Sequence, residues 1–202
     1  MIIIGITGSI GMGKTTIASM LRFLKIPVFD SDQEVKEILD KNISVIEKIY
    51  NEWPETVCFK KMKINKLLLA KKIFTDKKNR KKLENIIHPI VHHKRKIFIE
   101  QNNLSLIIGL DIPLLYETGT DKLCDYIFLA NTSERVQKKR VMLRPHMTEN
   151  MFALIKTSQW SNEKKKEKKP IIINTSYGKL VSFLIVSFYL IKIIINGKKK
   201  ND

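Results

Sequence analysis

Gly8-Ser9-Ile10-Gly11-Met12-Gly13-Lys14-Thr15 is the stretch that decides the fold, because it matches the phosphate-loop pattern G-x-x-x-x-G-K-[ST] in full. The apolar run Ile2–Ile6 precedes it and predicts a buried strand, and the segment 15–25 follows it and predicts a helix. Loop N–H groups and a helix N-terminus together bind phosphate. Lys14 is therefore predicted to reach the β- and γ-phosphates of a nucleotide, and the Thr15 hydroxyl to bind Mg²⁺. A glycine-rich turn that matches by chance is the alternative, and the flanking strand and helix disfavour it.

Length and composition indicate one globular domain, since 202 residues, 44% of them hydrophobic, suffice to bury a sizeable core. Cys58 and Cys124 lie far apart without a C-x-x-C spacing. This argues against a disulfide framework or a zinc site and predicts a reducing, cytoplasmic location. No signal-peptide pattern is expected, because the N-terminus leads directly into the first apolar run.

The formal net charge of +17 favours anionic partners such as nucleic acid, a membrane surface or phosphorylated metabolites. Lysine far outnumbers arginine, and isoleucine and asparagine are abundant, which A/T-rich coding would also produce. The lysine run Lys164–Lys169 is typical of a solvated surface. Aromatic and basic residues do not interleave as in nucleic-acid-binding modules, so we expect no nucleic-acid partner.

The C-terminal run Leu180–Ile195 is strongly apolar but contains Lys192. Its length of about 16 residues is shorter than the roughly 20 apolar residues of a membrane span. We therefore predict a last helix packed on the sheet, and regard a membrane anchor as the less favoured alternative.

Further apolar runs alternate with helical patterns and predict an α/β fold with a five-stranded, doubly wound parallel sheet. The four runs after the first are residues 26–30, 104–110, 126–130 and 171–173. The segment 33–101 between the second and third runs has a helical pattern throughout. Functional residues of such sheets collect at the carboxyl ends of the strands. The residues at these ends are the phosphate loop, Asp30, Asp32, Asp111 and Asn174.

Carboxylates follow two of these strands. Asp30-Ser31-Asp32 offers a base that would accept a hydroxyl proton during phosphoryl transfer, or else a cap for the next helix, and the spacing leaves both open. Asp111 ends an apolar strand, as expected of a carboxylate that holds Mg²⁺; a turn residue before Pro113 is the alternative. Glu117 is a weaker candidate for an acidic cluster with Asp111.

Arg135, Arg140 and Arg144 fall on a helix predicted to begin near Ser133, with the last two four residues apart on one face. Such guanidinium groups would close over a transferring phosphate as part of a flap. A solvated helix face is the alternative. His88-Pro89 has no companion metal ligands, so the residues alone indicate a structural histidine or a helix boundary at Pro89.

Taken together in their order, the motifs resemble the dephospho-CoA kinase family over residues 1–175. The resemblance rests on Gly5–Thr16, on Val28-Phe29-Asp30-Ser31-Asp32, on Leu83-Glu84 with Ile87-His88-Pro89, on Asp111-Ile112-Pro113-Leu114-Leu115-Tyr116-Glu117, and on Gln137–Arg144, Gln159 and Asn174. The phosphate loop alone is shared by many nucleotide enzymes, whereas the ordered combination is much more specific. The chain departs from the family at Lys169-Pro170 and at Thr175-Ser176.

The resemblance implies a P-loop NTPase-type three-layer α/β/α fold. It implies a core formed by 1–37, 103–134 and 170–202, a helical acceptor-binding subdomain at 38–102 and a lid at 135–169. The implied reaction transfers the γ-phosphoryl group of ATP, with Mg²⁺, to the 3′-hydroxyl of dephospho-CoA, and these small molecules are the expected partners. Another small-molecule P-loop kinase, of the nucleoside monophosphate or shikimate type, is the first alternative. A basic nucleic-acid- or membrane-binding protein switched by ATP is the second, and the oligomeric state is left open.

The resemblance also implies roles for individual residues. Asp32 becomes the favoured base, with Lys14 and Arg140 as the other catalytic residues, and the acceptor is bound by Asp32, His88 and Asp111. Thr15 and Asp111 are implied to hold Mg²⁺, directly or through water. The residues implied to bind ATP are Gly11, Met12, Gly13, Lys14, Thr15, Thr16 and, near the adenine, Asn174.

Overall fold

The structure, a computed structural model, describes residues 1–145 and 147–198 and divides into two units. The first unit comprises Met1–Phe29 and Asn102–Asp202, and the second comprises Asp30–Gln101. Each unit is described by itself below.

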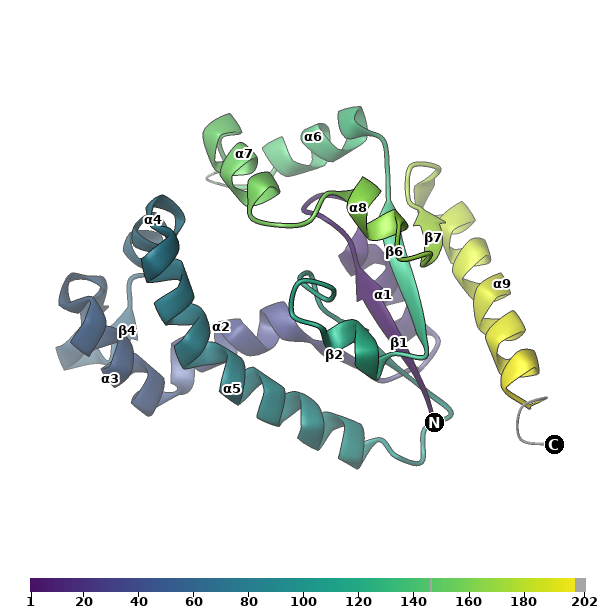
Figure 1. Ribbon diagram of the computed structural model, residues 1–202, viewed down its shortest axis with the longest axis horizontal. Coiled ribbons are helices and arrows are strands. Elements are labelled where there is room, and N and C mark those ends of the chain that lie inside the picture. Colours follow the sequence, from purple (N-terminus) through teal and green to yellow (C-terminus); the bar gives the residue numbers. More distant parts are fainter. Residues whose placement is uncertain (146, 199–202) are drawn as a thin grey trace. The chain divides into compact units, whose positions relative to one another are not determined.

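A five-stranded parallel sheet forms the centre of the first unit and confirms the predicted fold class (Figure 1). Its strand order is β2-β5-β1-β6-β7. The bounds are β1 Ile2–Thr7, β2 Val28–Asp30, β5 Ile107–Asp111, β6 Tyr126–Asn131 and β7 Ile171–Asn174. Because Ile6 of β1 lies opposite Asp111 of β5, the carboxyl end of β5 lies beside the start of the phosphate loop. Similarly, Asn131 of β6 lies opposite Asn174 of β7.

Helices α1 (Lys14–Phe23) and α9 (Gly178–Lys198) pack against each other and share one apolar core with the sheet. Ile17 and Leu21 of α1 are spaced to point the same way, and both are fully buried. From α9, Val186, Leu190 and Ile193 enter the same core. The prediction of a last helix packed on the sheet is confirmed, and Figure 1 shows α9 running beside α1. The other helices of this unit are η3 Thr120–Leu123, α6 Glu134–Met142, α7 Glu149–Thr157 and α8 Asn162–Lys166.

Two boundaries in the first unit differ from prediction. The third strand begins at Ile107, because Leu104 is 99% exposed and belongs to the turn before the strand. Helix α6 ends at Met142, so Arg144 lies beyond it, and the predicted helix face shared by Arg140 and Arg144 is wrong. Pro145 explains this end, since the residue before a proline is disfavoured in helical conformation.

The second unit is mainly helical, as its pattern predicts, but the structure adds a small antiparallel hairpin that the prediction missed. The bounds are α2 Ser31–Lys41, α3 Ile43–Glu52, η1 Pro54–Thr56, β3 Val57–Cys58, η2 Phe59–Lys61, β4 Lys63–Ile64, α4 Lys66–Thr75 and α5 Lys77–Gln101. Strands of two residues are too short for an alternating pattern to emerge. The helix boundary expected at Pro89 is also wrong: α5 continues through it, because Leu83, Ile87 and Val91 bury one continuous face.

Candidate active site

The phosphate loop folds as its glycines require. The φ angles are 154° at Gly8, 77° at Gly11 and 98° at Gly13, all in the region that side chains rarely adopt. A Cβ atom at Gly13 would lie 2.6 Å from Thr175 Oγ1, and one at Gly11 would lie 2.6 Å from Val141 Cγ2. Gly13 is the N-cap of α1, and no side chain of the described residues caps it. The N-terminus of α1 is therefore open to an anion, as the motif predicts.

Lys14 and Asp111 are brought together at this helix end. Lys14 Nζ lies 2.6 Å from Asp111 Oδ1, and the Asp111 side chain is 1% exposed. The pair joins the first residue of α1 to the last residue of β5. Thr15 follows on the exposed side of the first turn of α1. A cation and a carboxylate thus meet where the phosphates of a nucleotide would be held.

Arg140 reaches the same region from α6. Its guanidinium donates from Nη1 to Thr175 Oγ1 at 2.8 Å and from Nη2 to the Thr175 carbonyl at 2.7 Å. The Thr175 hydroxyl donates in turn to the Met12 carbonyl at 2.8 Å. Thr175 is 3% exposed, and its N–H donates to the Asn131 carbonyl. One buried threonine therefore joins the phosphate loop, the ends of β6 and β7, and the arginine of α6.

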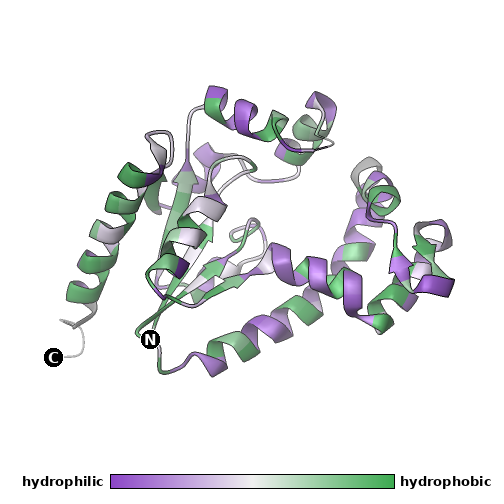
Figure 2. Ribbon diagram, turned by 180° about the vertical axis from the view of Figure 1, so that it is seen from behind, coloured by the Kyte–Doolittle hydropathy of each residue, from purple (hydrophilic) through white to green (hydrophobic). Residues whose placement is uncertain are grey.

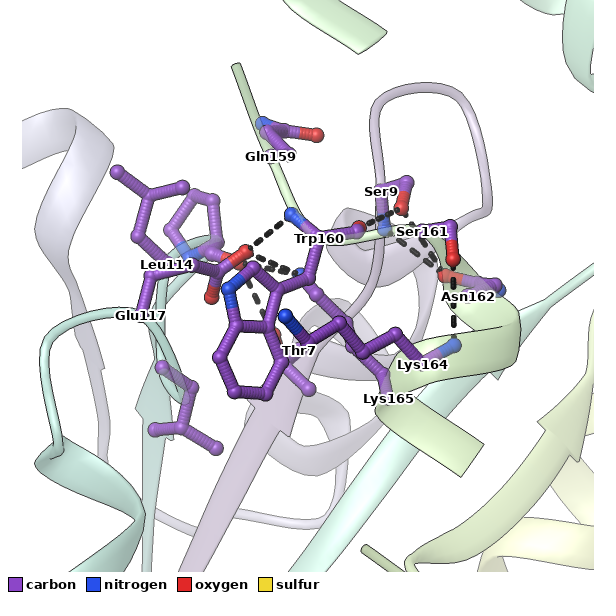
Figure 3. Close-up of polar contacts among 12 residues, drawn as sticks. Thr7, Ser9, Leu114, Glu117, Gln159, Trp160, Ser161, Asn162, Lys164 and Lys165 are labelled. Atoms are coloured by element: carbon purple, nitrogen blue, oxygen red, sulfur yellow. Dashed lines mark hydrogen bonds and ion pairs between the residues drawn. The ribbon is translucent and has the colours of Figure 1, made fainter. Parts of the chain in front are cut away.

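The segment 159–162 holds the first half of the phosphate loop (Figure 3). The Ser9 N–H donates to Asn162 Oδ1 at 3.2 Å, and the Ile10 N–H donates to Gln159 Oε1 at 3.0 Å. The Ser9 hydroxyl lies 3.1 Å from both the Trp160 carbonyl and Asn162 Oδ1. These two loop N–H groups are therefore occupied by protein side chains, and the Met12 N–H bonds to the Ser9 carbonyl at 3.2 Å.

Lys165 and Glu117 form a buried pair beneath this segment (Figure 3). Lys165 is 0% exposed, and its Nζ lies 3.3 Å from Glu117 Oε1 and donates to the Pro113 carbonyl at 3.0 Å. Glu117 Oε1 also accepts the Trp160 N–H at 2.7 Å. Burial lowers the pKa of Lys165, while Glu117 acts in the opposite direction. Only Oε1 of Glu117 makes these contacts, and its Oε2 is a buried atom without a hydrogen-bond partner among the described residues. The expectation that Glu117 belongs to an acidic cluster with Asp111 stays a prediction.

The remaining predicted residues lie as follows. Asp30 is the N-cap of α2, accepting the Gln33 N–H at 3.0 Å, whereas Asp32 is exposed in the first turn. His88 lies in the middle of α5, stacked on His92 with ring centroids 6.1 Å apart. Asn174 ends β7, and its Oδ1 accepts the Ser176 N–H. Met12 is buried in the loop, and Thr16 lies in the first turn of α1, where its N–H donates to the Gly13 carbonyl.

Sequence reasoning missed two residues of this site. Thr175 counted only as a departure from the family pattern, although its place directly after a strand end was a usable signal. Lys165 was grouped with a lysine run interpreted as solvated, and the structure overturns that interpretation for this residue. Nothing in the local sequence separates Lys165 from its neighbours, since only the tertiary fold buries it.

The site consists of a glycine-rich loop between a central parallel strand and a helix N-terminus. A lysine at this helix end pairs with the carboxylate of the next strand. These features define a P-loop kinase. Comparison with known proteins narrows this class. A sequence model of the family described as dephospho-CoA kinase matches residues 2–179, and the chain belongs to this family. It is therefore a kinase of coenzyme A biosynthesis.

Named relatives agree with this assignment. The dephospho-CoA kinase of Bartonella quintana is 39% identical over 175 residues, covering 86% of this chain and 88% of the relative. That of Zymomonas mobilis is 34% identical over 173 residues, covering 86% and 87%. Among solved structures, a Thermus thermophilus protein superposes with a TM-score of 0.79 at 28% identity, covering 95% of this chain and 96% of that one. The dephospho-CoA kinase from Campylobacter jejuni gives a TM-score of 0.69 at 25% identity, covering 97% and 98%.

Proposed function

We propose that the protein transfers the γ-phosphoryl group of ATP to the 3′-hydroxyl of dephospho-CoA in the cytoplasm. Family membership supports the reaction, and the geometry that carries it is the Lys14–Asp111 pair at the uncapped N-terminus of α1. A nucleoside monophosphate or shikimate kinase would use the same donor half, but the family match runs from residue 2 to residue 179 and includes the second unit.

The donor half would bind the phosphates of ATP through backbone N–H groups. Residues Gly11–Thr16 are proposed for this role from the phosphate-loop motif; the N–H groups of Ser9 and Ile10 bind side chains, and those of Met12 and Thr16 would have to exchange their backbone carbonyls for phosphate oxygens. Lys14 would exchange Asp111 for the β- and γ-phosphate oxygens. Arg140, held beside the loop by Thr175, would neutralise charge that develops during transfer.

Mg²⁺ fits the residues available. The described residues contain no cluster of three or more His, Cys, Asp or Glu side chains able to hold a metal by themselves. Mg²⁺ at nucleotide sites needs only one or two protein oxygens besides phosphates and water. The Thr15 hydroxyl and the Asp111 carboxylate would supply these oxygens. Bound there, the ion would screen the charge of the phosphates.

The acceptor half is proposed from the family motifs. By the family motif, Asp32 would accept the proton of the 3′-hydroxyl, whereas the Asp30 carboxylate caps α2 by accepting the Gln33 N–H. His88 and Asp111 would contact the acceptor, and Asn174 would lie near the adenine of ATP. In this scheme residues 38–102 form the acceptor-binding part and 135–169 the lid.

The test is to incubate the full chain with ATP, Mg²⁺ and dephospho-CoA and to detect coenzyme A by mass. Shikimate and CMP serve as competing acceptors; turnover of either one without turnover of dephospho-CoA would reject the proposal. Asp32→Asn should lower turnover by roughly 10²–10⁴-fold while ATP still binds. Asp30→Asn is the matched control, because asparagine caps a helix as well as aspartate does. Equal losses in both variants would show that Asp32 is not the base.

A further inference from the structure

Helix α9 is apolar on two opposite faces, and the residues that the structure describes cover only one of them. The inward face carries Val186, Leu190 and Ile193, which are buried in the core. At about 100° per residue, the exposed apolar side chains fall within an arc of about 100° on the other side. Their exposed fractions are 73% for Leu180, 40% for Val181, 60% for Leu184, 62% for Phe188, 58% for Ile191 and 54% for Ile195. This set is called the outer face of α9, and Figure 2 shows α9 coloured as hydrophobic along nearly its whole length.

The outer face continues into an apolar groove. A cavity of about 490 Å³ lies between α9, the end of α1 and the turn before β5. Its lining includes Leu24, Lys25, Leu106, Ile191 and Ile194. Leu106 is 60% exposed, so the apolar surface extends beyond the helix itself. An exposed apolar surface of this extent indicates a site that contacts a membrane or another protein.

The charge around this face selects the kind of partner. From residue 168 to residue 198 the sequence contains five lysines and no aspartate or glutamate. Lys192 lies on α9, and Lys25 lines the groove. Two copies of a chain with a net charge of +17 that met through this face would bring their lysines together, which opposes association. An anionic lipid surface instead offers both an apolar interior and negative headgroups.

We propose that the outer face of α9 binds the surface of an anionic membrane, with the helix lying in the plane of the interface. From Leu180 to Ile195 the face is about 22 Å long at 1.5 Å per residue. The stretch Gly178–Asn196 has the length and hydropathy of a membrane-crossing helix, yet its inward residues complete the core of the sheet. Crossing the bilayer would remove those residues from the core, so the helix lies on the membrane rather than through it.

Co-sedimentation of the full chain with vesicles tests the proposal. Vesicles of phosphatidylcholine with about 30% phosphatidylglycerol should bind the protein, and vesicles of phosphatidylcholine alone should bind it at least ~10-fold more weakly. The double variant Leu184→Asp/Phe188→Asp should lower binding to anionic vesicles by at least ~10-fold, since two side chains that enter the lipid become charged. Its turnover of dephospho-CoA should stay unchanged, because both side chains are exposed on α9 and neither is among the residues proposed to bind ATP or dephospho-CoA.

Two further variants keep the test decisive. Leu67→Asp changes a leucine of equal exposure, 61%, in the second unit and should leave vesicle binding unchanged. Lys179→Glu/Lys192→Glu alters only exposed charges and should weaken binding even if the apolar variant folds poorly. Several results would overturn the proposal: no binding, equal binding to neutral vesicles, binding that resists alkaline extraction as a spanning helix would, or a dimer in light scattering that Leu184→Asp/Phe188→Asp abolishes.

Discussion

The buried pair Lys165–Glu117 should be strongly coupled in stability, and a double-mutant cycle measures this. The changes are Lys165→Met, Glu117→Gln and the two combined. Lys165→Met leaves the Glu117 carboxylate, 14% exposed, with the Trp160 N–H but without its counter-ion. Glu117→Gln leaves an ammonium group with 0% exposure, which keeps the Pro113 carbonyl as an acceptor but faces a neutral amide in place of its counter-ion. Breaking a buried pair from one side costs about 3–5 kcal/mol of unfolding free energy.

The double variant buries neither charge, so its cost should be smaller than the sum of the two single costs. The lost bond from Lys165 Nζ to the Pro113 carbonyl accounts for about 1.5–3 kcal/mol, as for hydrogen bonds that involve a charged group. With single costs of about 3 kcal/mol each, we expect a coupling energy of at least ~3 kcal/mol.

Urea unfolding followed by fluorescence is the assay, because Trp160 lies against this pair and reports on its environment. The exposed pair Lys156–Glu134, with an N–O distance of 3.0 Å, serves as the control and should show a coupling below ~1 kcal/mol. Additivity at Lys165 and Glu117 within ~0.5 kcal/mol, with unchanged m-values, would refute the reasoning that this pair is buried and paired in solution.

Four other outcomes are expected. Lys14→Ala should lose most of its turnover in the coenzyme A assay, because the loop loses the cation that would meet the phosphates; retained turnover would remove Lys14 from the mechanism. Thr175→Val should lower turnover and reduce the free energy of unfolding in urea by about 1–2 kcal/mol, because Arg140 Nη1 and the Met12 carbonyl both lose a partner. Thr175→Ser keeps the hydroxyl and should behave like the parent. Gly13→Ala should destabilise the protein more than Gly119→Ala, because both have positive φ but only the first Cβ would contact Thr175, at 2.6 Å; equal melting temperatures would contradict this. Burial lowers the pKa of His92 below its ordinary 6.5, and Arg95 and His88 act in the same direction. The unfolded chain therefore takes up a proton at a higher pH than the folded protein, so the free energy of unfolding should fall as the pH drops below about 6.5. In chemical unfolding across that range, His92→Gln should show a flatter dependence of stability on pH.

The parts of the fold that follow from local sequence were predictable. β1, the phosphate loop and α1 are contiguous in the chain, and each element has its own signal in apolar periodicity or glycine spacing. The four other parallel strands were predicted for the same reason, since buried parallel strands are apolar runs ended by polar residues. The limits appear where tertiary packing overrides a local preference. Pro89 predicts an end to α5, yet burial on both sides of it keeps the helix continuous.

The polar frame of the site was less predictable, because its bonds join residues far apart in sequence. Asn162 bonds to Ser9 across 153 positions, and Thr175 to Met12 across 163. No periodicity encodes such pairs. The lysine run illustrates this point: Lys164 lies with its Nζ 4.1 Å from the centre of the Trp160 ring, while the adjacent Lys165 is fully buried against Glu117. The two lysines are adjacent and identical in type, so only the tertiary structure distinguishes their environments.

These long-range hydrogen bonds hold the phosphate loop from outside. A glycine-rich loop is often described as a flexible cradle, yet here both halves of it are fixed from outside. Its first half is fixed by Gln159 and Asn162, and its second half by Thr175. Arg140 bonds to Thr175 as well, so the guanidinium group and the loop share one support. A substitution that moves Thr175 would displace the loop and the arginine together. Phosphate binding and charge neutralisation in this kinase should therefore respond to the same perturbations rather than separately.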